Sequence, residues 1–175
     1  METNKSCDPL VDLAKTAAEE YIKTGNVISP DSMPIPSDLD NPAGVFVCLK
    51  IGGQLRGCIG TIEPVTPALS EEIIQNAISA ATRDPRFRPV SPSELDDIKY
   101  SVDVLGEPEQ IYSMKDLDPK VYGVIVETRN KRGLLLPDLE GVDTIEDQVS
   151  IAMRKAGITS DEEISLSRFK VIRHE

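Results

Sequence analysis

Aromatic residues and histidine are scarce in this chain. Among its 175 residues there are no Trp, three Phe and four Tyr, so the core has to be mostly aliphatic. The one histidine, His174, stands directly before the last residue. A single histidine excludes a multi-histidine metal site, and its place next to the last residue excludes a histidine-based catalytic triad.

Cysteine pairs and long apolar runs are also lacking. The three cysteines show no CxxC spacing, which indicates a reducing compartment and argues against a disulfide framework or a structural zinc site. A transmembrane helix is indicated by about 18 or more consecutive apolar residues, and the chain has no such run. Residues 1–6 do not follow the order of charged and apolar residues that marks a signal peptide. A cytoplasmic protein with no membrane segment and no metal site is therefore predicted.

Basic residues are fewer than acidic ones, and the formal net charge is −11. An acidic chain repels the phosphate backbone unless its basic residues gather on one face. Generic nucleic-acid binding is therefore not expected. With 39% hydrophobic and 28% charged residues the composition is that of a globular protein. The length allows one domain, residues 1–175, which can consist of two small lobes.

Three helices are predicted from apolar residues at helical spacing. The first spans residues 9–24, with Asp8 as its N-cap and Gly25 at its exit. The second begins at Thr66-Pro67 and ends near Thr82.

The third spans residues 144–156, with Thr144 and Asp147 as a capping box and Gly157 at its end. Alternating apolar segments predict strands at residues 45–51, 54–62, 98–105, 121–128, 134–136 and, in the tail, 164–172. No regular βαβ order or nucleotide-binding fingerprint is present. The predicted class is α+β, an antiparallel-rich mixed sheet or sheets with about three helices.

The first predicted hairpin turns at Gly52-Gly53, because both glycines tolerate positive φ. If pairing continues from this turn without interruption, Cys48 lies opposite Gly57. Arg56 and Cys58 are then expected on one face of the sheet and Cys48 on the other. A disulfide between the two cysteines is therefore not expected.

Cys58 is the candidate catalytic residue. Gly57 and Gly60 flank it, and glycine inside a strand indicates a bulge or the close approach of another backbone or a ligand. Arg56 on the same face would lower the pKa of the thiol and favour a nucleophilic or redox-sensitive thiolate. Alternatively, Cys58 is a small buried hydrophobe for which the glycines make room. The lack of a histidine base weakens the interpretation as a cysteine hydrolase.

A basic cluster, residues 83–88, follows the second predicted helix. It forms either an anion site next to Arg56 or an Arg–Asp pair that locks the turn. Glu63 is expected to be the only carboxylate near Cys58 and Arg56, where it acts as an acid or base or simply faces solvent. The second basic segment, residues 129–133, is expected to be a solvated hairpin tip.

Several of these motifs resemble the signature of the AMMECR domain family. They are Leu55-Arg56-Gly57-Cys58-Ile59-Gly60-Thr61, Ala80-Ala81-x-x-Asp84-Pro85-Arg86-Phe87-x-Pro89, Glu94-Leu95, Gly133-Leu134-Leu135-Leu136-Pro137 and Lys155-Ala156-Gly157-Ile158. The resemblance extends from about Pro9 to Phe169, with Arg88 at a position where relatives commonly carry proline. It implies an α+β fold with two unequal lobes and a cleft between them. It also implies association with a Memo-like protein and a radical SAM protein, which form a three-part set with the similar domain in microbes.

Three functional hypotheses follow, in order of preference. The first is a binding or accessory component of a modification pathway, in which a cleft near the hairpin binds a small anion, a nucleotide or a partner segment. Its ligand-binding residues would be Arg56, Gly57, Gly60, Glu63, Asp84 and Arg86. The second is a pure protein-interaction module with Cys58 buried, and the third is an enzyme that uses Cys58. The shortage of conventional catalytic groups determines this order, and no cofactor is evident.

Overall fold

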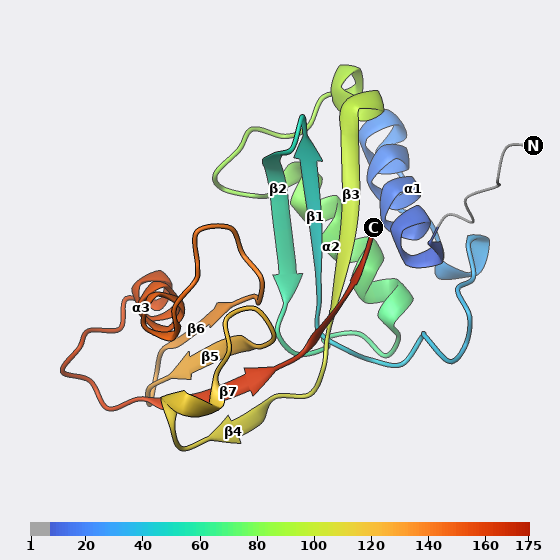
Figure 1. Ribbon diagram of the computed structural model, residues 1–175. Coiled ribbons are helices and arrows are strands. Elements are labelled where there is room, and N and C mark those ends of the chain that lie inside the picture. The colour runs from blue at the N-terminus through green and yellow to red at the C-terminus, as the bar shows by residue number, and fades with distance from the viewer. Residues whose placement is uncertain (1–7) are drawn as a thin grey trace, which may run out of the picture. The chain divides into compact units, whose positions relative to one another are not determined.

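The chain folds into two compact units in the computed structural model, which describes residues 8–175 (Figure 1). The first unit contains the described residues up to Val104 together with Arg173–Glu175, and the second contains Leu105–Ile172. Each unit buries a hydrophobic cluster of its own. Both are α+β with four-stranded sheets, which confirms the predicted class. Cys7 lies outside the described residues.

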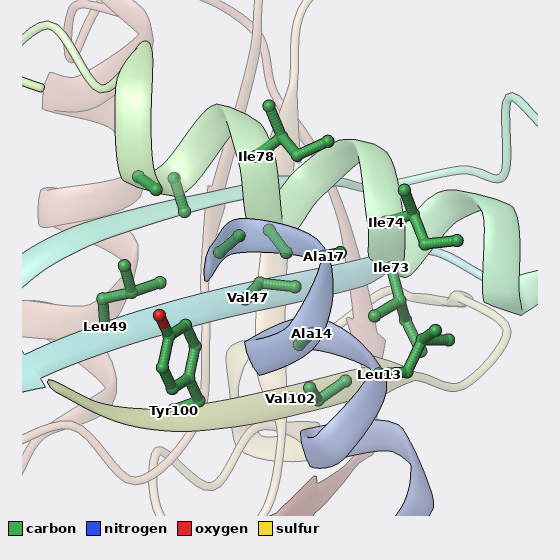
Figure 2. Packing of buried hydrophobic residues seen from close by; sticks show 14 of the residues in the cluster. Leu13, Ala14, Ala17, Val47, Leu49, Ile73, Ile74, Ile78, Tyr100 and Val102 are labelled. Carbon is green, nitrogen blue, oxygen red and sulfur yellow. The ribbon is translucent and has the colours of Figure 1, made fainter. Parts of the chain in front are cut away.

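The first unit is a sheet with two helices on one face. The strands of this sheet are ordered β2-β1-β3-β8, with the bounds β1 Val45–Ile51, β2 Gln54–Thr61, β3 Ile98–Leu105 and β8 Val171–His174. The chain passes from one unit to the other within β3 and β8. Helices α1 (Pro9–Thr24) and α2 (Leu69–Thr82) pack against each other, and α2 packs on β1 and β2. Figure 2 shows the aliphatic core that results, in which Leu13, Val47 and Ile73 are fully buried. Because aromatic residues are scarce, alanine and branched aliphatic side chains fill this core, and their small size allows close packing.

The ends of α1 are those predicted. The Asp8 carboxylate accepts hydrogen bonds from the amides of Leu10 (2.9 Å) and Val11 (3.4 Å). Gly25 ends the helix in the left-handed conformation, with φ of 77°, which glycine adopts without a steric penalty. Asp8 also contacts His174 of β8, at 2.6 Å between Oδ2 and Nδ1, so the only histidine joins the last strand to the start of α1.

Helix α2 starts later than predicted, at Leu69 rather than next to Thr66. The reason is Glu72, a buried carboxylate that accepts hydrogen bonds from the amides of Val65 (3.0 Å) and Thr66 (2.9 Å) and from the hydroxyl of Thr61 (2.5 Å). These bonds hold the preceding segment as a loop that folds back over the first turn of the helix.

The second unit is also a sheet with a helix, in the strand order β4-β7-β5-β6. The elements are β4 Glu109–Ile111, β5 Gly123–Glu127, β6 Arg132–Leu135, α3 Ile145–Ala156 and β7 Ser165–Phe169. Helix α3 has the predicted caps, Thr144 and Gly157. Strand β4 was not predicted, and the tail predicted as one strand forms two, β7 and β8, with Lys170 between them.

The register of the first hairpin differs from the prediction. Gly52 and Gly53 form the expected turn, with φ of 58° and 79°, but a β-bulge shifts the pairing between Leu49 and Lys50. Beyond the bulge Cys48 pairs with Cys58 instead of Gly57. The expected placement of Cys58 on the face opposite to Cys48 is therefore wrong, because one extra residue in β2 moves every later side chain of that strand to the other face.

Gly57 sits directly under α2, and this close approach explains why the strand contains a glycine. A Cβ atom at this position would overlap the carbonyl oxygen of Ala80. Glycine is needed at position 60 for a different reason, because a Cβ atom there would overlap the ring of Phe46. Both glycines thus make room for packing within the unit.

Replacing Gly57 by Ala is expected to lower the free energy of unfolding by about 1–3 kcal/mol, because the helix must move away from β2. Gly53→Asn is the control, since nothing lies within 4 Å of a Cβ atom there and asparagine tolerates positive φ. Urea unfolding of both variants measures the difference. Equal stability of the two variants would contradict the packing role of Gly57.

Candidate functional site

The turn that follows α2 lies along the free edge of β2, and the predicted site residues meet there. Among residues 8–175, β2 is an edge strand of its sheet, so its outward backbone groups have no strand partner there. The amide of Cys58 donates to Asp84 Oδ2 (2.9 Å), and its carbonyl accepts from Arg86 Nη2 (3.3 Å). Two side chains of the turn thus bind the main chain of Cys58 as a neighbouring strand would.

Asp84 is the centre of this turn. It is only 4% exposed and accepts from the backbone amide of Arg86 (3.1 Å), from Arg86 Nε (3.0 Å) and from Arg86 Nη2 (2.8 Å), in addition to Cys58. The hydrogen-bonded Arg86 guanidinium lowers the pKa of Asp84 to about 2, against the opposing effect of burial. The Arg–Asp pair that locks the turn, one of the two alternatives for residues 83–88, is therefore present.

Arg56 is held by a second carboxylate, that of Glu94. Arg56 Nε donates to Oε1 (2.8 Å) and Nη2 to Oε2 (3.2 Å), a bidentate pair. The same guanidinium donates to the carbonyl of Arg88 (3.0 Å), and the side chain is 12% exposed. The hydrogen bonds from Arg56 lower the pKa of Glu94 to about 2. Arg56 therefore ties β2 to the segment that follows the turn.

Phe87 is close to both guanidinium groups of the site. The guanidinium carbons of Arg56 and Arg86 are 5.9 Å and 5.6 Å from its ring centre, within the range of a cation–π contact. The side chain of Arg86 is 55% exposed. Arg83 and Arg88 are exposed on the same turn, so its outer surface is basic.

The thiol of Cys58 faces Cys48, and both cysteines are free and partly exposed. A hydrogen bond between the thiols raises the pKa of Cys58, and burial raises it further. The same hydrogen bond lowers the pKa of Cys48 against the effect of burial. The thiolate interpretation of Cys58, one of the two alternatives from the sequence, is therefore not supported, because the pKa of this thiol is raised.

The predicted site residues are only partly brought together. Arg56, Gly57, Cys58, Asp84 and Arg86 lie together at the β2 edge, and Gly60 lies further along the same strand against Phe46.

Glu63 lies exposed in the bend after β2, and the expectation that it is the only carboxylate near Cys58 and Arg56 is wrong. Asp84 and Glu94 hold those positions, because the chain folds back along β2 after α2. The contribution of Glu94 was missed, although Ser91 and Glu94 form a capping box that the sequence shows.

Two further properties concern the whole of residues 8–175. No helix among them is long and apolar enough to cross a membrane. No three His, Cys, Asp or Glu side chains in this range are grouped in a way that could hold a metal ion. The basic segment 129–133 belongs to the second unit, where Lys131 pairs with Glu162 (2.9 Å).

The chain is similar to a known family, to two proteins of other organisms and to one solved structure. The sequence profile of the family described as AMMECR1 matches residues 11–174. A protein of Thermotoga maritima is 52% identical over 95% of this chain and 97% of its own length. A protein of Clostridium acetobutylicum is 51% identical over 96% of this chain, which spans 36% of that longer relative. The crystal structure of an uncharacterized protein from Pyrococcus horikoshii superposes with a TM-score of 0.86 at 36% identity, covering 94% of this chain and 88% of that one.

The two ion pairs at the β2 edge predict acid sensitivity. The pKa values of Asp84 and Glu94 are about 2 in the folded protein, against 3.8 and 4.5 without the fold. The unfolded chain takes up protons first as the pH falls, so the free energy of unfolding should decrease between about pH 4.5 and pH 2. Asp84→Asn should remove part of this dependence and destabilise the protein by about 2 kcal/mol at pH 7.

Asp96→Asn is the control for this experiment, because Asp96 is exposed and a surface substitution changes stability by no more than about 0.5 kcal/mol. Urea unfolding at a series of pH values measures the slopes. An unchanged slope in Asp84→Asn would show that this carboxylate does not carry the acid sensitivity.

Proposed function

The chain belongs to the AMMECR1 family, and from this premise we propose that it is a binding component of a modification pathway rather than the catalyst. It uses the turn formed by residues 83–88, clamped to the edge of β2, to bind an acidic group of a partner. The observation that carries this proposal is the Asp84 carboxylate, which accepts four hydrogen bonds from Cys58 and Arg86.

These hydrogen bonds support a rigid platform. Asp84 and Glu94 form ion pairs with Arg86 and Arg56, and both guanidiniums contact the ring of Phe87. A binding surface held in one conformation loses little conformational entropy when a partner binds. In this arrangement Cys58 contributes its main chain, which both anchors of the turn contact.

The charge of the turn supports an acidic partner. Arg83, Arg86 and Arg88 are exposed on one short segment of a chain whose net charge is −11. Guanidinium groups bind carboxylate and phosphate oxygens in a planar, bidentate way. Because the rest of the chain is acidic, an anionic group is steered toward this segment.

The partner class follows from the family resemblance. The Memo-like and radical SAM proteins that accompany the similar domain in microbes are the proposed partners, and the cytoplasm is the proposed location. An acidic segment of either protein would bind the turn, or the turn would hold a phosphate or nucleotide that such a protein modifies.

An NMR titration of the ¹⁵N-labelled protein tests the proposal, with inorganic phosphate and a short Glu-rich peptide as separate probes. Amide shifts are expected at residues 56–60 and 83–88. The double variant Arg83→Gln/Arg88→Gln, which leaves the Arg86–Asp84 clamp intact, should weaken binding about tenfold, or about 1.4 kcal/mol.

The matched control is Arg129→Gln/Arg154→Gln, which changes the net charge equally by removing exposed arginines of the second unit. It should bind the probes as the parent does. Equal weakening of binding by both double variants would show that the net charge of the protein, and not the turn, determines the affinity. Shifts that avoid residues 56–60 and 83–88 would exclude the turn as the binding surface.

A further inference from the structure

The bulge in the first hairpin places two thiols opposite each other. Cys48 of β1 and Cys58 of β2 are register partners, and directly opposite residues of an antiparallel pair project on the same face. They lie on the face away from the helices, because their neighbours Val47 and Leu49 are buried in the core beneath α1 and α2. Both cysteines are partly exposed.

The backbone of Cys58 shows which kind of cross-strand pair this is. Its amide donates to Asp84 and its carbonyl accepts from Arg86, so both groups point away from β1. Cys48 and Cys58 therefore form a non-hydrogen-bonded pair, the closer of the two antiparallel geometries, with Cα atoms about 4.5 Å apart in general. A disulfide requires Cα atoms about 4.4–6.8 Å apart. This general separation falls within the range of a disulfide, so the register of the two cysteines is compatible with a bond between them.

We propose that Cys48 and Cys58 are a dithiol pair that a hydroperoxide oxidises to a disulfide, which makes this face of the first unit a redox modification site. The proposal goes beyond the binding function, since it needs no partner at residues 83–88. It rests on the register and on the contact between the two thiols.

The reaction proceeds in two steps that balance. The Cys48 thiolate attacks one oxygen of hydrogen peroxide; an S–O bond forms, the O–O bond breaks, and the departing hydroxide takes a proton to become water. The Cys58 sulfur then attacks the sulfur of the Cys48 sulfenic acid; the S–S bond forms, and the hydroxyl leaves with the Cys58 proton as a second water. Two thiols and one peroxide give one disulfide and two waters.

The groups around each thiol indicate which cysteine attacks the peroxide and which one resolves the sulfenic acid. The hydrogen bond from Cys58 stabilises a thiolate at Cys48 and lowers its pKa, and the nearby Lys50 and Arg173 act in the same direction, while burial and Asp103 oppose them. Cys58 remains protonated next to it and acts as the resolving thiol. Asp84 and Arg86 hold the main chain of Cys58 in place while its sulfur changes partner.

Peptide mapping of the oxidised protein tests this proposal directly. The full chain with Cys7→Ser, which removes the third thiol, is treated with hydrogen peroxide, blocked with N-ethylmaleimide and digested with trypsin without reduction. Trypsin cuts after Lys50 and Arg56 and so separates the two cysteines. The expected product is a cross-linked pair of peptides that lacks two hydrogen atoms and separates on treatment with dithiothreitol.

Single variants of the same background test the roles. In Cys58→Ser, Cys48 should still react and be trapped as a sulfenic acid by dimedone. In Cys48→Ser, oxidation of Cys58 should slow by about tenfold or more, because its thiol is not activated. The cross-link itself is measured on the protein with both cysteines present, so a variant that folds poorly does not affect that result.

Three results would overturn the proposal. One is oxidation of each cysteine to a sulfinic acid without a cross-link, and another is protection of both thiols until the chain unfolds. The third is unchanged oxidation of Cys58 in Cys48→Ser. None of these depends on whether residues 83–88 bind anions, so failure here and failure of the binding proposal are separate outcomes.

Discussion

The hydrogen bond from the Cys58 amide to the Asp84 carboxylate closes the open edge of the first unit's sheet. An edge strand presents backbone donors and acceptors that invite pairing with another chain, and here Asp84 and Arg86 satisfy the donor and the acceptor of Cys58. The same carboxylate holds the guanidinium and the amide of Arg86. The contact between β2 and the turn after α2, and the placement of the Arg86 guanidinium, therefore depend on one buried side chain.

Both units bring a helix onto a hairpin through a glycine in the second strand. A side chain at Gly57 would overlap the carbonyl oxygen of Ala80 in α2, and one at Gly133 would overlap that of Ala152 in α3. In each case the hairpin precedes its helix along the chain. Glycine lets the helix backbone approach the strand more closely than any other residue does. The same packing solution thus occurs twice, which explains why both hairpins tolerate a residue that weakens isolated strands.

Local patterns predicted much of the fold, and contacts between distant residues explain the errors. The bounds of α1, β1 and β3 agree with the prediction because caps, glycines and alternation act within a few residues. The start of α2 was missed because it depends on Glu72 and its loop partners. At the site, Glu63 is near Arg56 in sequence, but the partner of Arg56 is Glu94, which is brought there by the fold. The ion pair between Arg56 and Glu94 joins residues 38 positions apart and has no signal in local spacing, whereas the Asp84–Arg86 pair was one of the alternatives that the sequence offered.

The bulge between Leu49 and Lys50 shows how one residue changes the chemistry that a sequence permits. Without it, Cys48 and Cys58 would lie on opposite faces and could not react with each other. With it, they are neighbours on one face, and the clamp at Asp84 determines the rest, because it turns the backbone groups of Cys58 outward and leaves the closer pairing geometry toward Cys48. The clamp that holds the basic turn at the free edge of β2 therefore also sets the pairing geometry of the two thiols between β2 and β1. Binding and thiol chemistry are separate functions here, but they share the same structural support.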